Sequence, residues 1–278
     1  MRSILWLLLC LPLLAGAQSS SSGQDELKKL AWQVGPVDAR IADKATIKVP
    51  EGHVFLDAPN TKRFLQLAGN PPRDGHYLFA PRNLSWFAVF SFDPVGYIKD
   101  DEKIDPDDLL KKLKSSDEPA NEERKRLGMR ALYTDGWQVP PHYDPQTKRL
   151  EWGMRLRNEA GQYTINYTSR LLGRSGVMSA VLVADVETLA KDTAQFKAGL
   201  AGFDYVAGEK YAEFKSGDKV AEYGLAALVL GGAAAAAAKT GLLKTFGKFI
   251  WIALLAVFGF IPALWRKITG RGKDEAPK

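Results

Sequence analysis

The stretch Arg149-Leu150-Glu151-Trp152-Gly153-Met154-Arg155-Leu156-Arg157 decides the fold predicted for this chain. Its apolar side chains occupy every second position and alternate with charged residues or glycine. Successive side chains of a β-strand point to opposite faces of a sheet, so this alternation places one face on a core and the other in water. The stretch therefore predicts a half-buried strand.

Two more strands are expected directly after it. The turn signal Asn158-Glu159-Ala160-Gly161 is followed by a strand over 162–172. A second turn, Gly173-Arg174-Ser175-Gly176, leads to a strand over 177–184. Strands joined by short glycine-containing turns pair as neighbours, so these three strands predict an antiparallel meander.

Further strands are expected nearer the N-terminus. The runs 45–49 and 53–56 flank the turn Pro50-Glu51-Gly52, which predicts two short strands. The run 86–92 is almost continuously apolar, as in a strand that is covered on both faces.

Helices are expected between these strands, because capping residues and prolines mark their starts. Asp57 can cap the first helix, and Asp105 followed by Pro106 can begin the second. The remaining expectations are a helix over 117–127, a helix capped by Asp185 and reaching about Leu200, and a returning strand over 211–215. Hairpin-linked strands mixed with helices predict an α+β fold, an antiparallel sheet with packed helices, for a domain over residues 30–219.

The N-terminal residues have the layout of a secretory signal peptide. A short positive start precedes the apolar run 4–14, and Ala15-Gly16-Ala17 forms a small-residue cleavage site. This layout predicts a signal peptide over 1–17, followed by a flexible serine-rich linker over 18–29. The single cysteine, Cys10, lies inside the signal, so the mature protein is expected to contain no disulfide.

The C-terminal part predicts transmembrane helices after the domain. Residues 249–265 carry no charge, have tryptophans near both ends and precede a basic tail over 266–278, which is typical of a membrane-spanning helix. An Ala/Gly-rich segment over 220–238 is also apolar, and its small residues recur at four-residue spacing. Two topologies stay open: a hairpin in which both segments span, slightly favoured, and a single span through 249–265.

The charge distribution argues against a nucleic-acid-binding protein. The formal net charge of +6 resides almost wholly in the C-terminal segments and at Arg2, whereas acidic and basic residues balance between residues 18 and 219. A nucleic-acid-binding domain would carry its basic patch on the folded part. Positive charge beside apolar segments instead fits lipid headgroups, so membrane lipid is the expected partner.

Two neighbouring residues, His142 and Asp144, are candidates for acid–base catalysis. The alternative is structural, because Asp144 followed by Pro145 before a strand is a turn signal. No metal site and no cofactor are predicted. The acidic cluster between residues 100 and 108 lacks calcium-loop spacing, and the sequence contains neither paired-histidine zinc motifs nor phosphate-binding loops.

Asn166, Arg170 and Arg174 are candidates for a ligand-binding clamp. They are spaced four residues apart along the predicted strand and its end, so they are expected to share one side of the sheet. Two guanidinium groups beside an amide could hold an anionic group. The alternative is that both arginines lie in solvent.

Several strings together resemble one bacterial family of uncharacterised membrane-anchored proteins, which contain a domain of unknown function. The resemblance implies an inner-membrane protein with a periplasmic domain, and it brings no catalytic residues. The strings that carry it are Trp32-Gln33-Val34-Gly35-Pro36, Val49-Pro50-Glu51-Gly52, Gly96-Tyr97-Ile98-Lys99-Asp100-Asp101, Gly136-Trp137, Pro141-His142-Tyr143-Asp144, Leu150-Glu151-Trp152, Asn166-Tyr167, Arg170-Leu171-Leu172-Gly173-Arg174, Gly217-Asp218-Lys219-Val220-Ala221 and Tyr223-Gly224-Leu225.

These observations favour a non-enzymatic envelope module that binds a ligand or an envelope protein partner from the periplasmic side of the membrane. A second hypothesis is a membrane-anchored hydrolase or lyase that uses His142 and Asp144. A third is a subunit of a transport or pore complex, which the Ala/Gly-rich segment suggests.

Overall fold

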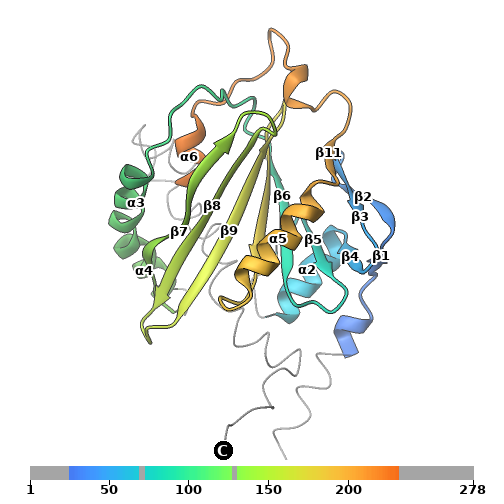
Figure 1. Ribbon diagram of the computed structural model, residues 1–278, viewed down its shortest axis with the longest axis horizontal. Helices are drawn as coiled ribbons and strands as arrows, with labels where there is room; N and C mark the ends of the chain where they lie inside the picture. Colours follow the sequence, from blue (N-terminus) through green and yellow to red (C-terminus); the bar gives the residue numbers. More distant parts are fainter. Residues whose placement is uncertain (1–24, 69–72, 127–129, 232–278) are drawn as a thin grey trace, which may run out of the picture.

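The computed structural model describes residues 25–68, 73–126 and 130–231. Its centre is an eight-stranded, wholly antiparallel sheet in the order β1-β4-β5-β6-β10-β9-β8-β7 (Figure 1). The strands are β1 Gln33–Val34, β4 His53–Leu56, β5 His76–Pro81, β6 Phe87–Asp93, β7 Leu132–Asp144, β8 Arg149–Asn158, β9 Tyr163–Leu172 and β10 Val177–Val183.

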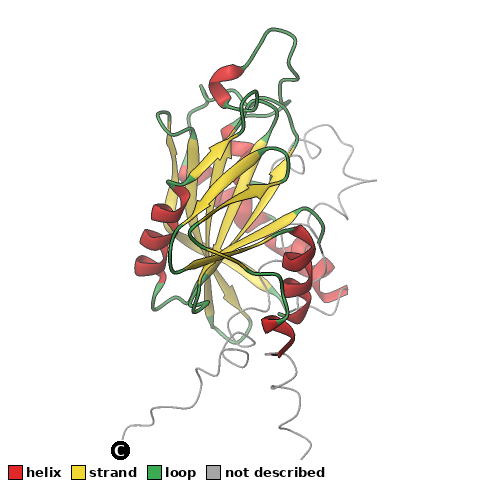
Figure 2. Cartoon of the chain, turned by 90° about the vertical axis from the view of Figure 1, so that its right-hand side faces the viewer, coloured by secondary structure: helices red, strands yellow, loops and turns green. Residues whose placement is uncertain are grey.

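Both faces of this sheet are covered, as Figure 2 shows. One face packs against α5 (Leu189–Leu200) and a three-stranded sheet of β11 (Phe203–Tyr205), β3 (Ala45–Val49) and β2 (Val37–Ile41). The other face carries α2 (Ala58–Leu67), α3 (Pro106–Ser115), α4 (Asp117–Arg126) and α6 (Leu225–Val229). The sheet therefore has two cores, one on each side, which we call the α5 face and the α3/α6 face.

The predicted meander is confirmed. β8, β9 and β10 are consecutive antiparallel neighbours, and Trp152 lies opposite Thr168, which in turn lies opposite Val181. The alternation along β8 places Leu150 and Trp152 in the core of the α3/α6 face. The predicted caps are also found: Asp57 accepts a hydrogen bond from the Asn60 N–H, and Asp105 accepts from two N–H groups at the start of α3.

Two local predictions are wrong. The chain around Tyr211 forms a short 3-10 helix, Tyr211–Glu213, instead of a strand, because the Glu213 carboxylate accepts the N–H groups of Gly208 and Lys210 and closes the turn. Asp185 does not cap α5. Thr188 occupies the cap position and makes no side-chain capping bond.

The end of the described chain is held against the domain. The Tyr97 N–H donates to the Lys219 carbonyl at 2.8 Å, and the Ala226 N–H donates to the Glu102 carboxylate at 3.0 Å. At Gly96 a Cβ would lie 2.6 Å from the Lys219 carbonyl oxygen, and φ is +99°, so both the close approach and the backbone conformation require glycine here. These contacts place α6 over the α3/α6 face.

Several predicted segments lie wholly or partly outside the described residues. The signal peptide 1–17, the span 249–265 and the tail 266–278 are wholly outside. Of the Ala/Gly-rich segment, residues 220–231 are described, and there Leu225 and Leu228 are buried against the sheet. Of the predicted linker, residues 25–28 form a helical turn in which Leu27 packs on the core. Among the helices described, none is long and apolar enough to cross a membrane.

Candidate functional site

A cavity of about 480 Å³ lies between the sheet and the helices of the α3/α6 face. Its floor is formed by side chains of six adjacent strands, β5, β6, β10, β9, β8 and β7. Its roof comes from α3, α4 and the segment that contains α6. Cavities of this volume are in the range that holds small ligands.

A row of polar side chains crosses one end of the cavity floor. The strand register places His76 opposite Ser91, Ser91 opposite Ser179, and Ser179 opposite Arg170. All four residues line the cavity. Four neighbouring strands thus each contribute one polar group at the same level of the sheet, a level that we call the polar row.

Arg170 is the unusual member of the polar row. Its Nε atom is buried and has no hydrogen-bond partner within the described ranges. No carboxylate in the same part of the chain lies within ion-pair distance of its guanidinium. Burial lowers the pKa of Arg170, but a guanidinium still stays protonated in a protein. The cavity therefore contains a half-buried positive charge that has no direct partner among the described residues.

Asn166 extends the polar surface along β9. It is only 4% exposed, and its Nδ2 atom is buried without a hydrogen-bond partner among the described residues. Thr168 lies between Asn166 and Arg170 on the same face of the strand and is 5% exposed. Buried amide and guanidinium groups normally find acceptors, so two orphaned donors on one cavity floor indicate acceptors that belong to a ligand or to water.

Two further polar groups surround Arg170. Burial raises the pKa of Asp93, and the positive charges of Arg170 and Lys219 only partly oppose this shift. The hydroxyl of Tyr223, just before α6, is buried and lacks a partner within the described ranges. Burial also raises the pKa of Tyr223, so this phenol stays neutral and can donate. Tyr223 interacts electrostatically with Arg170 but does not line the cavity, so the donor at this end of the cavity is Arg170 on β9.

His76 contributes an acceptor at the edge of the polar row. Its Nδ1 atom lies 2.8 Å from the carbonyl oxygen of Asp74, which can only accept, so Nδ1 carries the proton. Burial lowers the pKa of His76, which favours the neutral ring, and the neutral ring leaves Nε2 as an acceptor.

The opposite end of the cavity is apolar, and its polar groups are already satisfied. Leu113, Leu132 and Leu156 line it. Asp117, which also lies there, accepts hydrogen bonds from both the N–H and the hydroxyl of Thr134, at 2.8 Å each. The cavity therefore has one end with orphaned donors and one end that requires no further hydrogen bond.

The predicted clamp is only partly assembled. Asn166 and Arg170 share the cavity floor, as their spacing predicted. Arg174 does not join them, because β9 ends at Leu172 and the chain turns. Instead, the Arg174 guanidinium makes two hydrogen bonds to Asp218, at 2.6 and 2.7 Å. These bonds raise the pKa of Arg174 and lower the pKa of Asp218 to about 2.

His142 and Asp144 lie at the end of β7 and line neither the cavity of the α3/α6 face nor the groove on the α5 face that is described next. His142 is exposed. The Asp144 carboxylate accepts hydrogen bonds from the Gln146 N–H and the Thr147 hydroxyl, as the turn interpretation expects. The hydroxyl and amide donors lower the pKa of Asp144. The hydrolase hypothesis therefore finds no support at this position.

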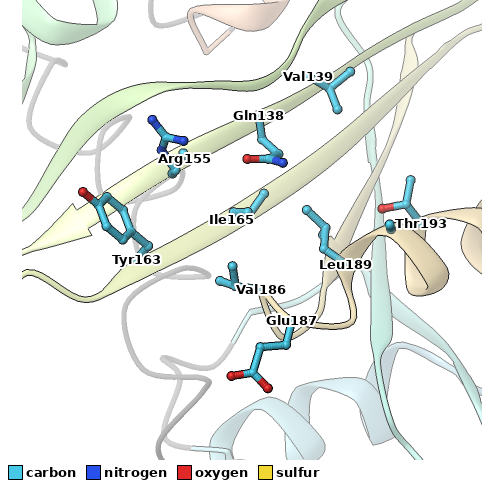
Figure 3. A pocket seen from close by; sticks show the side chains of 10 residues that line it. Gln138, Val139, Arg155, Tyr163, Ile165, Val186, Glu187, Leu189 and Thr193 are labelled. Atoms are coloured by element: carbon cyan, nitrogen blue, oxygen red, sulfur yellow. The ribbon is translucent and has the colours of Figure 1, made fainter.

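A second concave surface lies on the α5 face, between β7, β8, β9 and the start of α5 (Figure 3). Its one guanidinium, that of Arg155, is paired with Asp135 at 2.5 Å and lies 5.6 Å from the ring of Tyr163. Val139, Tyr163 and Val186 are partly exposed there. Because Arg155 already has its partner, this groove contains weaker signs of a ligand site than the cavity.

Sequence reasoning missed Ser91, Ser179, Asp93 and His76. They come from three strands, His76 from β5, Ser91 and Asp93 from β6 and Ser179 from β10, and only the strand order brings them beside Arg170. In the described part of the chain, no group of three or more His, Cys, Asp or Glu residues could hold a metal ion.

Comparisons with known proteins give a family but no activity. No protein of curated function matches the chain in sequence. One solved structure with a similar arrangement is the solution structure of cyanobacterial PsbP from Synechocystis sp. PCC 6803, with 11% identity and a TM-score of 0.35, covering 63% of this chain and 92% of that chain. Residues 33–262 match the family DUF2167, described as a protein of unknown function, and the chain belongs to that family.

Proposed function

We propose that this chain is a membrane-anchored envelope protein whose periplasmic domain binds a ligand with an anionic group in the cavity of the α3/α6 face. The signal-peptide layout at residues 1–17 and the apolar segment 249–265 support the location. The cavity supports the activity. The single observation that carries the proposal is the buried Nε atom of Arg170, which has no hydrogen-bond partner among the described residues, in a side chain that no carboxylate pairs with directly.

The positive charge of Arg170 destabilises the folded state unless an anion neutralises it. Withdrawing an ion from water into a protein interior costs several kcal/mol, and the cost is recovered only through well-placed partners of opposite charge. The negative charge of Asp93 favours the charged form of Arg170. Burial, however, favours the neutral form of Asp93. A carboxylate, sulfonate or phosphate beside Arg170 would supply the acceptor that its Nε atom lacks.

Binding fits the cavity better than catalysis does. Nucleophilic catalysis needs a hydroxyl or thiol within hydrogen-bond reach of a base. Ser91 and His76 lie opposite each other on β6 and β5, but no hydrogen bond joins them. The groups of the polar row are placed to contact a ligand rather than to activate one another.

The test is binding of the anionic fluorophore 1-anilinonaphthalene-8-sulfonate to the full chain in a maltoside detergent. We expect saturable fluorescence that Arg170→Leu weakens by about tenfold or more, since a charge-assisted hydrogen bond is worth about 1.5–3 kcal/mol. Arg155→Leu, which removes the paired guanidinium on the other face, is the matched control and should leave binding unchanged. Equal binding by wild type and Arg170→Leu would overturn the proposal.

A further inference from the structure

Along the strands, the cavity reaches from the level of Arg170 to that of Leu156, and these two ends differ in chemistry. Along β8, the register places Leu150 at the level of Arg170, and Leu156 lies six residues further on. At about 3.3 Å per residue, the two levels are about 20 Å apart. Both Arg170 and Leu156 line the cavity, so it extends over much of that length.

The distribution of hydrogen-bonding capacity follows the same axis. At one end the Nε donor of Arg170 is orphaned, and the orphaned Asn166 amide lies four residues away along the same strand. At the other end Thr134 and Asp117 satisfy each other, and the Asn121 side chain bonds both backbone groups of Leu132. A ligand that filled the whole cavity would meet unpaired donors at Arg170 and, at the level of Met154, at Asn166, but would need no acceptor near Leu132.

The walls between these ends are hydrocarbon and aromatic. Trp152 and Met154 from β8 face the cavity, and α6 contributes Leu228 and Val229 from the roof. At roughly 30 Å³ for each water, a cavity of about 480 Å³ has room for about 16 waters, or for a ligand with a similar number of heavy atoms. A cavity of this volume with such walls suits a small ligand that has a large apolar part.

We infer that the ligand is a single-chain amphiphile with an anionic head, of the kind represented by a fatty acid or an alkyl phosphate. This inference rests on the proposed function and names its ligand class. The head accepts from Arg170, and the chain runs along β8 past Trp152 and ends near Leu156 and Leu132. Apolar burial of the chain supplies affinity, and the buried guanidinium selects the head.

The experiment is photolabelling of the full chain, in a maltoside detergent, with dodecanoic acid that carries a diazirine at its methyl end. We expect labelled peptides to contain Leu113, Leu132 or Leu156. Arg170→Leu should reduce this labelling by about tenfold or more, and Arg155→Leu should leave it unchanged. The methyl ester of the same probe, which lacks the charge, should label the cavity about tenfold less than the acid.

A second variant keeps the inference falsifiable if Arg170→Leu does not fold. Leu156→Trp fills the apolar end while it preserves the head site, so it should reduce labelling by the dodecanoic acid probe and spare an octanoic acid probe. Equal labelling by acid and ester, or labels found only outside the cavity, would overturn the amphiphile inference.

The binding function and the ligand class can be disproved separately. If binding of the fluorescent sulfonate depends on Arg170 but the fatty-acid probe does not label the cavity, the site binds a small anion, and only the ligand class is wrong. If neither probe depends on Arg170, the proposed binding function is wrong as well.

Discussion

The two faces of strand β9 place equally buried polar residues in opposite situations. On the α5 face, Tyr167 and Ser169 are 1% and 0% exposed, and both donate to the carboxylate of Glu151, which also pairs with Lys197 at 2.8 Å. On the α3/α6 face, Asn166 is 4% exposed, and both it and Arg170 contain a buried nitrogen without a partner.

The difference separates stability from binding. A polar cluster whose members satisfy one another stabilises the fold, and removing one member leaves the others unpaired. A polar cluster with orphaned donors stabilises nothing until an acceptor arrives. We therefore expect mutations on the two faces of the same strand to have opposite effects on the free energy of unfolding.

The largest effect is expected on the α5 face. Glu151→Ala removes the acceptor of two buried hydroxyls, those of Tyr167 and Ser169, and each unsatisfied group costs about 1–3 kcal/mol. We expect the free energy of unfolding to fall by about 2–5 kcal/mol, measured by urea denaturation of the full chain in detergent. Glu151→Gln keeps one acceptor oxygen and should lose less. A loss below about 1 kcal/mol for Glu151→Ala would contradict the view that this cluster supports the fold.

The opposite sign is expected for Arg170→Leu without ligand. Replacing a buried charge by an apolar side chain of similar size is often neutral or stabilising by about 1–4 kcal/mol. We expect the free energy of unfolding to stay the same or to rise by about 1–3 kcal/mol, while anion binding is lost. If this variant is strongly destabilised, Arg170 has a structural partner, and the contrast between the faces breaks down.

The two faces should also differ in their response to acid. Burial raises the pKa of Glu151, but hydrogen bonds from Lys197, Ser169 and Tyr167 outweigh it and leave that pKa lowered. A lowered pKa in the folded state adds stability above the ordinary value near 4.5, and this stability is lost as pH falls through the folded pKa. The contribution of Glu151 should therefore fade on acidification.

Asp93 should show the reverse. Because burial raises its pKa above the ordinary value of 3.8, the unfolded chain releases the proton first, and the contribution of Asp93 is lost as pH rises from about 3.8 through the folded pKa. Urea denaturation between about pH 3 and 6 should show that Asp93→Asn and Glu151→Gln change the pH slope of stability in opposite directions. Parallel slopes for both variants would show that the two carboxylates have similar surroundings.

The sequence could predict strand β9, but not that the polar residues on its two faces differ in whether they have partners. Alternation along 149–157 and the glycine-containing turns were enough for the meander, and four-residue spacing placed Asn166 and Arg170 on one face. The long strand β7 was missed, because bulges between Thr134 and Gly136, Trp137 and Val139, and Val139 and His142 interrupt its period of two.

The unpaired state of Arg170 is a tertiary property. Whether a guanidinium finds a carboxylate depends on what the sheet order and the α6 segment bring near it, and no local pattern states this. The same limit explains Arg174, which the spacing rule assigned to the clamp. The rule holds only while the strand continues, and Asp218, the actual partner of Arg174, lies far along the chain.

Arg174→Ala therefore gives the smallest expected effect and the sharpest control. Both side chains of the Arg174–Asp218 pair are about one-fifth exposed, and in such a pair the cost of desolvation offsets much of the attraction between the charges. We expect a small loss of stability that high salt diminishes, and photolabelling by the fatty-acid probe that equals wild type. Arg170 and Arg174 lie four residues apart, so a variant pair that differs only in labelling would show that the pairing of the guanidinium, and not positive charge at this end of β9, determines the ligand site. Reduced labelling by Arg174→Ala would place both arginines in one clamp, as the spacing alone suggested.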